Sequence, residues 1–269
     1  MGLTLKNTTK FAYCSDLHLD FGSLVIDNTE NVDCLILAGD IIEFSQLVPK
    51  SDLSYNYVDE FFKNISDQFK QVIWVPGNHE YYGSSIWQGP MIANRYIEAN
   101  GFGNIKVVNN DVVYVNDVPV VCSTLWTDLG NANPIVMEMA GRSMNDYRHI
   151  DIKRGDIDVA LRPIDTYNMH MEALQFLDSA ISDVPCVVVS HHAPSFACSD
   201  YPPSVLDNAY MSNLCEFILD RPSINYWIYG HTHARIEFDL GETTVMSNCR
   251  GYAKYEKMAK TFELKYFEV

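Results

Sequence analysis

The sequence predicts an α/β fold, and three observations support this class. Short apolar segments alternate with longer segments in which apolar residues recur at helical spacing. Residues 33–39, DCLILAG, are apolar almost without interruption, which is typical of a strand buried on both faces of a sheet that helices cover. No internal repeat, low-complexity tract or linker interrupts the chain. We therefore expect one domain over residues 1–269.

The first half of the chain predicts strands and helices in alternation. In order, the expected elements are a strand at 10–15, the strand at 33–39, a helix at 55–70, a strand at 71–77 and a helix around 86–101. The helix at 55–70 carries its apolar residues on one side, namely Val58, Phe61, Phe62, Ile65 and Phe69. We expect Ser84 or Ser85 to cap the helix around 86–101, and Pro90 to interrupt it.

The second half changes its rhythm. Residues 105–126 alternate short apolar runs with Asn and Asp turns, which predicts a meander of strands. The segment from about 128 to 160 is the least regular, and we interpret it as an insertion on the substrate side of the fold. The remaining expected elements are helices at 163–183 and 205–220 and strands at 184–192, at 225–231, on either side of Gly241 and at 262–269.

Composition indicates a folded protein of a reducing compartment. Hydrophobic residues make up 47% and charged residues 20% of the chain, and no apolar run approaches the roughly 20 residues that span a bilayer. The N-terminal residues lack the apolar run and cleavage site of a secretory signal. The seven cysteines form no C-x-x-C pair, which disfavours disulfides and thiolate zinc sites. We expect a cytoplasmic location.

The charge balance restricts the possible partners. The chain has 19 Lys and Arg against 35 Asp and Glu, for a formal net charge of −16. No basic run exceeds the two residues Lys153 and Arg154, so tight binding to long duplex nucleic acid is disfavoured. A small anionic substrate remains compatible with the sequence if its site carries its own positive charge.

Polar side chains follow five of the expected strands at the point where each strand ends. These side chains are Asp16 and His18, Asp40, Asn78 and His79, His191 and His192, and His231 and His233. They include six of the eight histidines. Because ligands bind beyond the carboxyl ends of strands in α/β sheets, five such ends could build a single site.

Spacing and glycines favour the same interpretation. Asp16 and His18 are two residues apart, as are His231 and His233, and side chains two apart in extended chain point the same way. Each pair can reach one shared centre or two neighbouring centres. Gly39, Gly77 and Gly230 precede these groups and let the backbone turn sharply.

The ordered set Asp-x-His, Gly-Asp, Gly-Asn-His, His after a strand and Gly-His-x-His resembles the calcineurin-like metallophosphoesterase superfamily, in particular its bacterial and phage-type members. The resemblance spans residues 14–233. It implies a four-layer α/β/β/α sandwich with mixed sheets, and a dinuclear metal centre at the carboxyl ends of the strands.

The resemblance also implies a role for each residue of the set. Asp16, His18, Asp40 and His233 would hold one metal, and Asp40, Asn78, His191 and His231 the other, with Asp40 bridging. His79 would be the catalytic acid that meets the substrate or protonates the leaving oxygen.

The chemistry of the set agrees with the resemblance. Two divalent ions bring four positive charges, and two aspartates with a bridging hydroxide return three, so positive charge remains for a phosphate oxygen. Paired metals about 3.5–4 Å apart orient phosphate and generate hydroxide at neutral pH. Imidazole, carboxylate and amide without thiolate suit manganese, which we favour, and also iron, zinc, cobalt or nickel.

The second motif departs from one branch of the superfamily. It reads GDIIEFS, without the Asp-Arg-Gly continuation of the protein serine/threonine phosphatases, so that substrate class is disfavoured. Glu80, directly after His79, is expected to make a structural hydrogen bond.

Candidate substrate contacts lie outside the five strand ends. Arg142, Arg148 and Arg250 are candidates because a planar guanidinium fork suits phosphate oxygens. His192 could line the pocket or support its neighbour. Five aromatic residues could stack on a nucleobase or pack in the core, namely Tyr81, Tyr82, Trp87, Trp126 and Tyr147.

The sequence therefore predicts a metal-dependent phosphoesterase that hydrolyses phosphate mono- or diesters of a small phosphorylated molecule or nucleotide by means of metal-bound hydroxide. Two alternatives stay open: a nuclease on short single-stranded nucleic acid, and a scaffold that keeps the fold without the chemistry. The sequence does not distinguish monoester from diester, and it does not give the oligomeric state.

Overall fold

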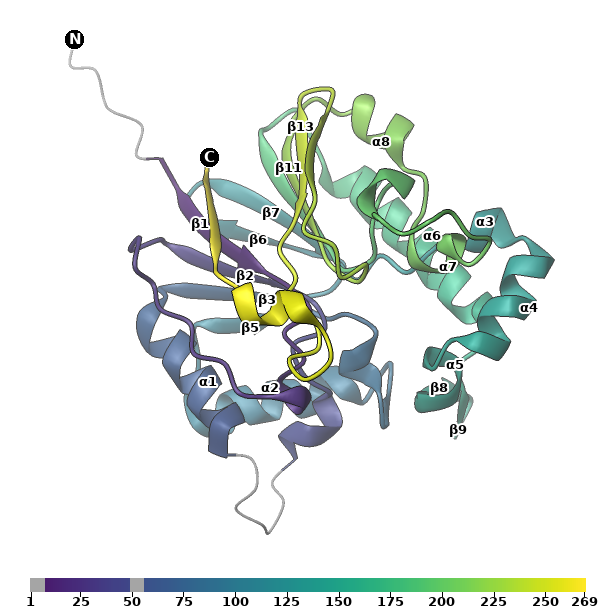
Figure 1. Ribbon diagram of the computed structural model, residues 1–269, viewed down its shortest axis with the longest axis horizontal. Helices are drawn as coiled ribbons and strands as arrows, with labels where there is room; N and C mark the ends of the chain where they lie inside the picture. Colours follow the sequence, from purple (N-terminus) through teal and green to yellow (C-terminus); the bar gives the residue numbers. More distant parts are fainter. Residues whose placement is uncertain (1–7, 49–55) are drawn as a thin grey trace.

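Two mixed β-sheets stacked face to face form the centre of the protein in the computed structural model (Figure 1). The structure describes residues 8–48 and 56–269. The expectation that the N-terminus carries no secretory signal rests in part on residues 1–7, which lie outside the described residues. Within the described ranges, no helix combines the length and apolar character that a membrane span requires.

The first sheet comes mainly from the N-terminal half. Its order is β14 (Lys265–Glu268), β1 (Lys10–Cys14), β2 (Cys34–Ala38), β3 (Gln71–Val75) and β5 (Ile105–Val107). β1, β2, β3 and β5 run parallel, and β14 closes the edge antiparallel to β1. All five residues of β2 are buried, as the uninterrupted apolar run predicts.

The second sheet comes mainly from the C-terminal half. Its order is β12 (Glu237–Leu240), β13 (Thr243–Ser247), β11 (Ile224–Tyr229), β10 (Cys186–Ser190), β7 (Val118–Ser123) and β6 (Asp111–Val115). The four central strands run parallel, with β12 and β6 antiparallel at the two edges.

Apolar side chains fill both the space between the sheets and their outer faces. Alternate residues of β1 and β2, such as Phe11, Tyr13 and Ile36, pack against Val187 and Ile228 of the second sheet. On the outer face of the first sheet lie α1 (Asn56–Gln68) and α2 (Gly89–Asn100). On the outer face of the second sheet lie α6 (Pro163–Ala180) and α8 (Cys215–Leu219). The predicted four-layer α/β/β/α sandwich is confirmed (Figure 1).

The meander expected over residues 105–126 is wrong in its first strand. β5 joins the first sheet beside β3, whereas β6 and β7 form a hairpin in the second sheet. Asn110, with a φ of 50°, lies between β5 and β6, and Asn116, with a φ of 52°, lies in the turn between β6 and β7. Alternating apolar residues predict the strands but carry no information about which sheet each strand joins.

The start of α2 also differs from the expectation. Pro90 stands in the first turn, where its missing N–H costs nothing, so it begins the helix and does not interrupt it. Ser84 and Ser85 form β4, which pairs with β8 (Ile150–Arg154), and Gln88 precedes the helix. The Ser85 hydroxyl accepts a hydrogen bond from the Gln88 N–H at 3.1 Å.

The segment from 128 to 160 is more regular than its composition indicates. It holds α3 (Leu129–Ala132), α4 (Pro134–Ser143), α5 (Asp146–His149), β8 and β9 (Ile157–Ala160). β4, β8 and β9 form a third, small sheet. Elements this short show little periodicity, which is why the sequence reads as irregular.

Short elements complete the fold. The helix expected at 205–220 divides into α7 (Asp207–Tyr210) and α8. The 3-10 turns are η1 (Leu19–Phe21), η2 (Phe44–Leu47), η3 (His79–Tyr81), η4 (Phe196–Cys198) and η5 (Lys257–Thr261). Several of these turns directly follow strands and carry the side chains considered next.

Candidate metal centre

The carboxyl ends of β1, β2, β3, β10 and β11 meet where the two sheets come together. His191, after β10, reaches across to β2, because its Nδ1 lies 3.0 Å from the carbonyl oxygen of Ala38. The backbone N–H of His231, after β11, donates to Asp16 Oδ1 at 2.9 Å, after β1. The fold thus brings all five predicted strand ends into one place.

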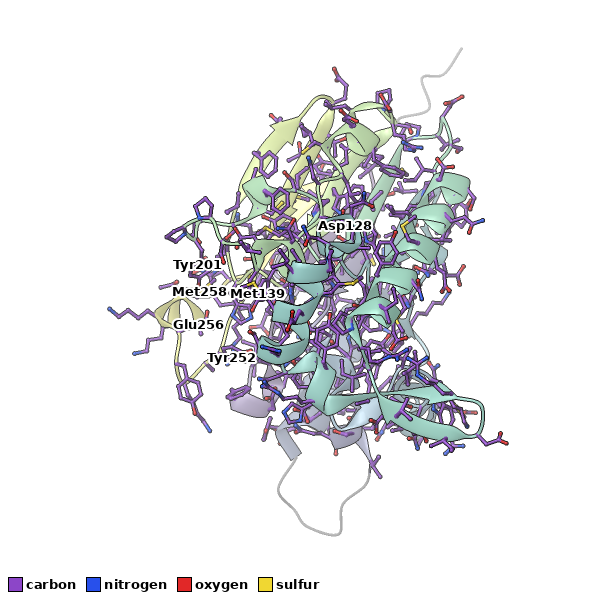
Figure 2. All side chains as sticks on the ribbon, turned by 90° about the vertical axis from the view of Figure 1, so that its right-hand side faces the viewer. Asp128, Met139, Tyr201, Tyr252, Glu256 and Met258 are labelled. Atoms are coloured by element: carbon purple, nitrogen blue, oxygen red, sulfur yellow. The ribbon has the colours of Figure 1, made fainter. Side chains whose placement is uncertain are left out.

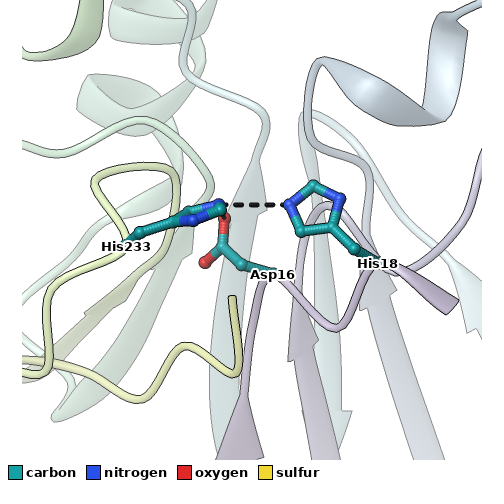
Figure 3. A group of neighbouring side chains, drawn as sticks. All are labelled: Asp16, His18 and His233. Carbon is teal, nitrogen blue, oxygen red and sulfur yellow. Dashed lines mark hydrogen bonds and ion pairs between the residues drawn. The ribbon is translucent and has the colours of Figure 1, made fainter. Parts of the chain in front are cut away.

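Asp16, His18 and His233 form the first group of possible metal donors (Figure 3). One donor atom from each lies within 4.8 Å of the others. The Nε2 atoms of His18 and His233 are 3.1 Å apart, and His233 Nε2 lies 3.6 Å from Asp16 Oδ1. Asp16 and His18 are almost completely buried.

Asp40, His191 and His231 form a second group with the same mutual distance limit of 4.8 Å. His191 Nε2 lies 3.3 Å from Asp40 Oδ1 and 3.1 Å from Asn78 Oδ1. The amide oxygen of Asn78 therefore belongs to this group as well.

Asp40 lies between the two groups. Its Oδ1 faces His191, and its Oδ2 lies 3.8 Å from His18 Nε2. Asp40 also forms a third set of donors with His18 and His79. One carboxylate thus stands within reach of both groups, which is the arrangement that a bridging ligand requires.

Burial and charge shift the pKa values in opposite directions at this centre. Burial lowers the pKa of His18 and of His231 well below the ordinary value, so both imidazoles are neutral. Burial opposes ionisation of Asp40, but the neighbouring imidazoles of His191, His79 and His18 together outweigh it and hold the pKa of this carboxyl well below its usual range. Burial raises the pKa of Asp16. A metal cation bound between these buried groups would replace the protons that the groups otherwise share.

The hydrogen-bond pattern fits a metal. Nε2 of His231 is buried and has no hydrogen-bond partner among the described residues. Nδ1 of His191 faces the Ala38 carbonyl, and Nδ1 of His233 lies 2.7 Å from Glu256 Oε1, so each ring donates there and turns an Nε2 lone pair toward the centre. Unpaired buried nitrogen and lone pairs aimed at one point are the features of an imidazole metal site.

Three glycines leave room for the centre. A Cβ at Gly39 would lie 2.1 Å from His191 Nδ1, and one at Gly77 would lie 2.2 Å from Asp40 Oδ1. A Cβ at Gly230 would lie 2.8 Å from Asp16 Oδ2. Only Gly39 of the three has a φ in the left-handed region, so at Gly77 and Gly230 the requirement is space and not a sharp turn.

The prediction from residue spacing assumes that the donor residues have extended backbone, but the structure shows that several of them do not. Five of them have positive φ, namely Asp16 (51°), His18 (43°), Asp40 (56°), His231 (69°) and His233 (48°). Asp16 and His18 still join one group, whereas His231 and His233 join different groups. Such strained backbone gathers at functional sites, where the surrounding structure holds it in place.

His79 stands at the mouth of the centre. Its N–H donates to Asp40 Oδ1 at 2.9 Å, and its ring stacks on that of Tyr82 at 4.3 Å. Its Nε2 lies 3.4 Å from the hydroxyl of Tyr252. His79 is half-buried and lines the cavity described below, so a bound molecule can contact its ring.

Glu80 makes the structural hydrogen bonds that the sequence predicts. The fully buried carboxylate accepts from the N–H groups of Asp40, Ile41 and Gly77 and from the indole of Trp74, at 2.7–2.9 Å. Burial raises the pKa of Glu80, and these donors oppose that rise. Glu80 thereby fixes the loop of Asp40 to the loop of Asn78.

A cavity of about 510 Å³ opens in front of both donor groups. Its lining residues come from the donor groups, from residues 143–146, from residues 199–211 and from residues 252–256. No Lys or Arg among the described residues lines it.

The sequence predictions missed several residues that line this cavity, and three of these contact donor residues. Asp146 is buried and accepts a hydrogen bond from Asn78 Nδ2 at 2.6 Å, and Tyr252 lies 4.3 Å from the His18 ring. Glu256 bonds His233. Asp146 lies in the segment that supplied Arg142 and Arg148, and Tyr252 lies two residues after Arg250, so the regions were identified but not the residues that face the cavity.

The candidate arginines lie outside the cavity lining. Arg142 pairs with Glu138 on an exposed helix face, with N and O atoms 2.6 Å apart, and Arg148 donates to the carbonyl of Arg142. Arg250 is buried and donates to the carbonyl oxygens of Leu17, Gly22 and Ser23. Its position indicates that it anchors the loop after β1.

The remaining candidates have packing positions. His192 is buried, and its ring lies 4.2 Å from that of His231. His170, outside the motifs, is buried in α6 against the carbonyl of Trp126. Tyr82 lines the cavity, whereas Tyr81, Trp87, Trp126 and Tyr147 do not.

Comparison with known proteins identifies relatives over nearly the whole chain. The family model described as calcineurin-like phosphoesterase matches residues 9–235. An uncharacterized protein of Acanthamoeba polyphaga mimivirus, L509, is 24% identical over 257 residues, which cover 90% of each chain.

Solved structures share the fold. The phosphopantetheinyl hydrolase PptH of Mycobacterium tuberculosis superposes with a TM-score of 0.68 and 17% identity, over 97% of this chain and 96% of the other. A candidate 5′-nucleotidase of Staphylococcus aureus, determined with α-ketoglutarate, gives a TM-score of 0.50 and 17% identity, over 90% of this chain and 48% of the other.

Proposed function

The chain belongs to the calcineurin-like phosphoesterase family, whose members are metal-dependent hydrolases of phosphate esters, and from that premise we propose its reaction. It hydrolyses mono- or diesters of phosphate in a small phosphorylated molecule or nucleotide, at a centre of two divalent cations. Manganese is the cation we favour, with iron, zinc, cobalt and nickel as alternatives.

We assign the donor groups to the two cations. Asp16, His18 and His233 hold one, His191, His231 and Asn78 hold the other, and Asp40 serves both. Such a pair of cations supplies Lewis acidity toward phosphate oxygens and lowers the pKa of water. The observation that supports this assignment best is the buried Nε2 of His231, which has no partner within the described residues although it lies among donors.

His79 is the residue we assign to proton transfer. It lines the cavity beside the donor groups and belongs to none of the two main groups, so its ring is available to a substrate. Its backbone N–H is fixed to Asp40 and its ring is stacked on Tyr82. In this position it donates a proton to the departing oxygen of the ester.

Metal analysis combined with aryl phosphate hydrolysis tests the proposed function. Protein prepared with Mn²⁺ should bind the metal and release p-nitrophenol from p-nitrophenyl phosphate or bis(p-nitrophenyl) phosphate, and a chelator should abolish the reaction. If the protein binds metal but hydrolyses neither ester, it is a scaffold that keeps the fold without catalytic activity.

The variant His79→Ala tests the proton-transfer role. It should keep its metals while turnover falls about 10²- to 10⁴-fold, the usual contribution of a positioned acid. His149→Ala is the matched control, because His149 is exposed and belongs to no donor group. Wild-type turnover in His79→Ala would remove the assignment.

We propose a single domain over residues 1–269, supported by the apolar core that both sheets share. We propose a cytoplasmic location, supported by seven free cysteines. The nuclease alternative is not favoured, because no Lys or Arg lines the cavity within the described residues.

A further inference from the structure

The cavity in front of the donor groups has acidic and aromatic walls. Its carboxylates are Asp40, Asp146, Asp207 and Glu256, its phenols are Tyr82, Tyr201, Tyr210 and Tyr252, and no cationic side chain of the described residues lines it. Asp40 faces the donor groups. We call the rest of the wall, with Asp146, Asp207, Glu256 and the tyrosines, the outer cavity.

Two of these carboxylates have strong partners. Asp146 accepts from the amide of Asn78 at 2.6 Å and from the hydroxyl of Tyr82 at 3.4 Å. Glu256 bonds Nδ1 of His233 at 2.7 Å. The charges of Asp146 and Glu256 therefore serve mainly these contacts with neighbouring residues of the cavity wall.

Asp207 is different. Its carboxylate accepts from the backbone N–H of Ser204 at 2.8 Å, and it forms no ion pair within the described part of the chain. It is half-buried at the start of α7. Its negative charge is thus available to a molecule in the cavity.

Tyr210 stands beside this charge. It follows Asp207 by three residues on α7, a spacing that places both side chains on one face. Burial and the charges of Asp146 and Asp207 raise the pKa of Tyr210. Its ring lies 5.2 Å from that of His231, so it connects the donor groups to the outer wall.

Tyr201 and Glu256 line the same cavity and lie near each other. Figure 2 shows Tyr201, Glu256 and Tyr252 gathered on one side of the molecule. Burial and the charge of Glu256 raise the pKa of Tyr201. The outer cavity thus combines aromatic rings with carboxylates on more than one side.

Aromatic faces combined with carboxylates attract ammonium groups and repel anions. We propose that the substrate is a phosphate ester whose alcohol carries a positively charged amine or quaternary ammonium group, held in the outer cavity by Asp207 and the tyrosines. This inference rests on the proposed function, because the cations held by the donor groups would bind the phosphate while the outer cavity selects the alcohol.

Two diesters that differ only in charge test the inference. They are p-nitrophenyl phosphorylcholine and p-nitrophenyl 3,3-dimethylbutyl phosphate, in which carbon replaces the quaternary nitrogen. We expect kcat/KM to be about 2- to 30-fold higher for the choline ester, the range of a cation held by aromatic rings. The preference should decrease as salt is raised. A ratio at or below one would overturn the inference.

The variant Asp207→Asn tests whether Asp207 causes the preference for the choline ester. Asparagine keeps the size of the side chain and its ability to accept from Ser204, so α7 should fold normally. The variant should lower the ratio of kcat/KM for the choline ester to that for the neutral ester several-fold. Glu216→Gln, on the exposed face of α8 outside the cavity, changes the net charge equally and should leave both values unchanged. An unchanged ratio in Asp207→Asn would contradict the role of Asp207.

A binding measurement separates this inference from the proposed function. Isothermal titration calorimetry of His79→Ala with phosphocholine and with 3,3-dimethylbutyl phosphate, in the presence of Mn²⁺, compares the two alcohols with turnover suppressed. Tighter binding of phosphocholine supports the inference even if no ester is hydrolysed. Equal binding overturns it even if both esters are hydrolysed.

Discussion

The donor groups and the outer wall of the cavity differ in how the fold holds them. Asp16, His18 and His191 are at most 1% exposed, whereas Tyr201 is 64% and Tyr210 38% exposed. The donors follow strands of the shared core and are fixed by backbone contacts, such as that of Asp16 with the His231 N–H. The outer residues come from short segments between strands.

This difference separates two properties of the site. Changes in the donor groups disturb buried, interdependent contacts and should affect metal binding and stability together. Asp207 and Tyr201 have few partners among the described residues, so changes there should affect only the choice of substrate. Asp146 and Glu256 contact donor residues, so changes there should affect metal binding as well. The following predictions test this separation, from the largest expected effect to the smallest.

Asp40→Asn should have the largest effect. Asparagine preserves the shape of the residue but removes the charge that both donor groups share, so metal content should fall and turnover should drop about 10³-fold, or about 4 kcal/mol in the barrier. Metal analysis and aryl phosphate kinetics measure both quantities.

Asp33→Asn is the matched control for this variant. Asp33 lies at the opposite end of the same strand, where it pairs with Lys70 at 2.8 Å on the surface. It should retain wild-type metal content and turnover. Full activity in Asp40→Asn would contradict a shared carboxylate.

Glu256→Gln should weaken metal binding about 10- to 100-fold, the usual cost of losing a carboxylate behind a ligating histidine. The glutamine oxygen can still accept from His233 Nδ1, but the negative charge that strengthens the imidazole as a ligand is absent. A fluorescence-monitored Mn²⁺ titration measures the dissociation constant. Glu242→Gln, exposed in the turn after β12, should bind as the wild type does.

Gly77→Ala should destabilise the fold by about 1–3 kcal/mol, because the added methyl group would lie 2.2 Å from Asp40 Oδ1 and force the centre apart. Urea unfolding gives the free energy, and metal analysis should show reduced occupancy. Gly103→Ala is the control, since an added Cβ there meets no atom within 4 Å. Equal stability of the two variants would show that the centre tolerates displacement.

Tyr201→Ala should have the smallest effect on the protein itself. Its free energy of unfolding should stay within about 0.5 kcal/mol of the wild type, and its metal content should not change. We expect only a lower kcat/KM for the choline ester, about twofold to fivefold. Loss of metal in this variant would show that the outer wall and the donor groups are coupled.

The sequence predicts the fold and the donor groups for the same reason. Buried strands of a parallel sheet have an unmistakable apolar pattern, and polar residues stand out where the pattern ends, as at Asp40 after β2. The strands at 10–15, 33–39 and 71–77 are found with small shifts in their ends. The family pattern over these positions is also borne out by the match to residues 9–235.

The outer wall could not be predicted in this way. Asp146 and Asp207 lie in helices of four residues, and Tyr252 lies in the loop between β13 and η5, where spacing carries little information. The chemical type of a residue also misleads. Arginine suits phosphate, yet Arg250 binds three backbone carbonyl oxygens and none of the candidate arginines lines the cavity. Which side chain faces a cavity depends on packing that a single sequence does not display.

The position of Asp40 between two sets of donors has a consequence for metal titrations. A first cation that draws on this carboxylate leaves less negative charge for a second, so the two binding events are linked and the coupling acts equally in both directions. We therefore expect the second cation to bind more weakly than the first, with two unequal dissociation constants. The protein should therefore pass through a half-loaded form whose abundance depends on the free metal concentration around it.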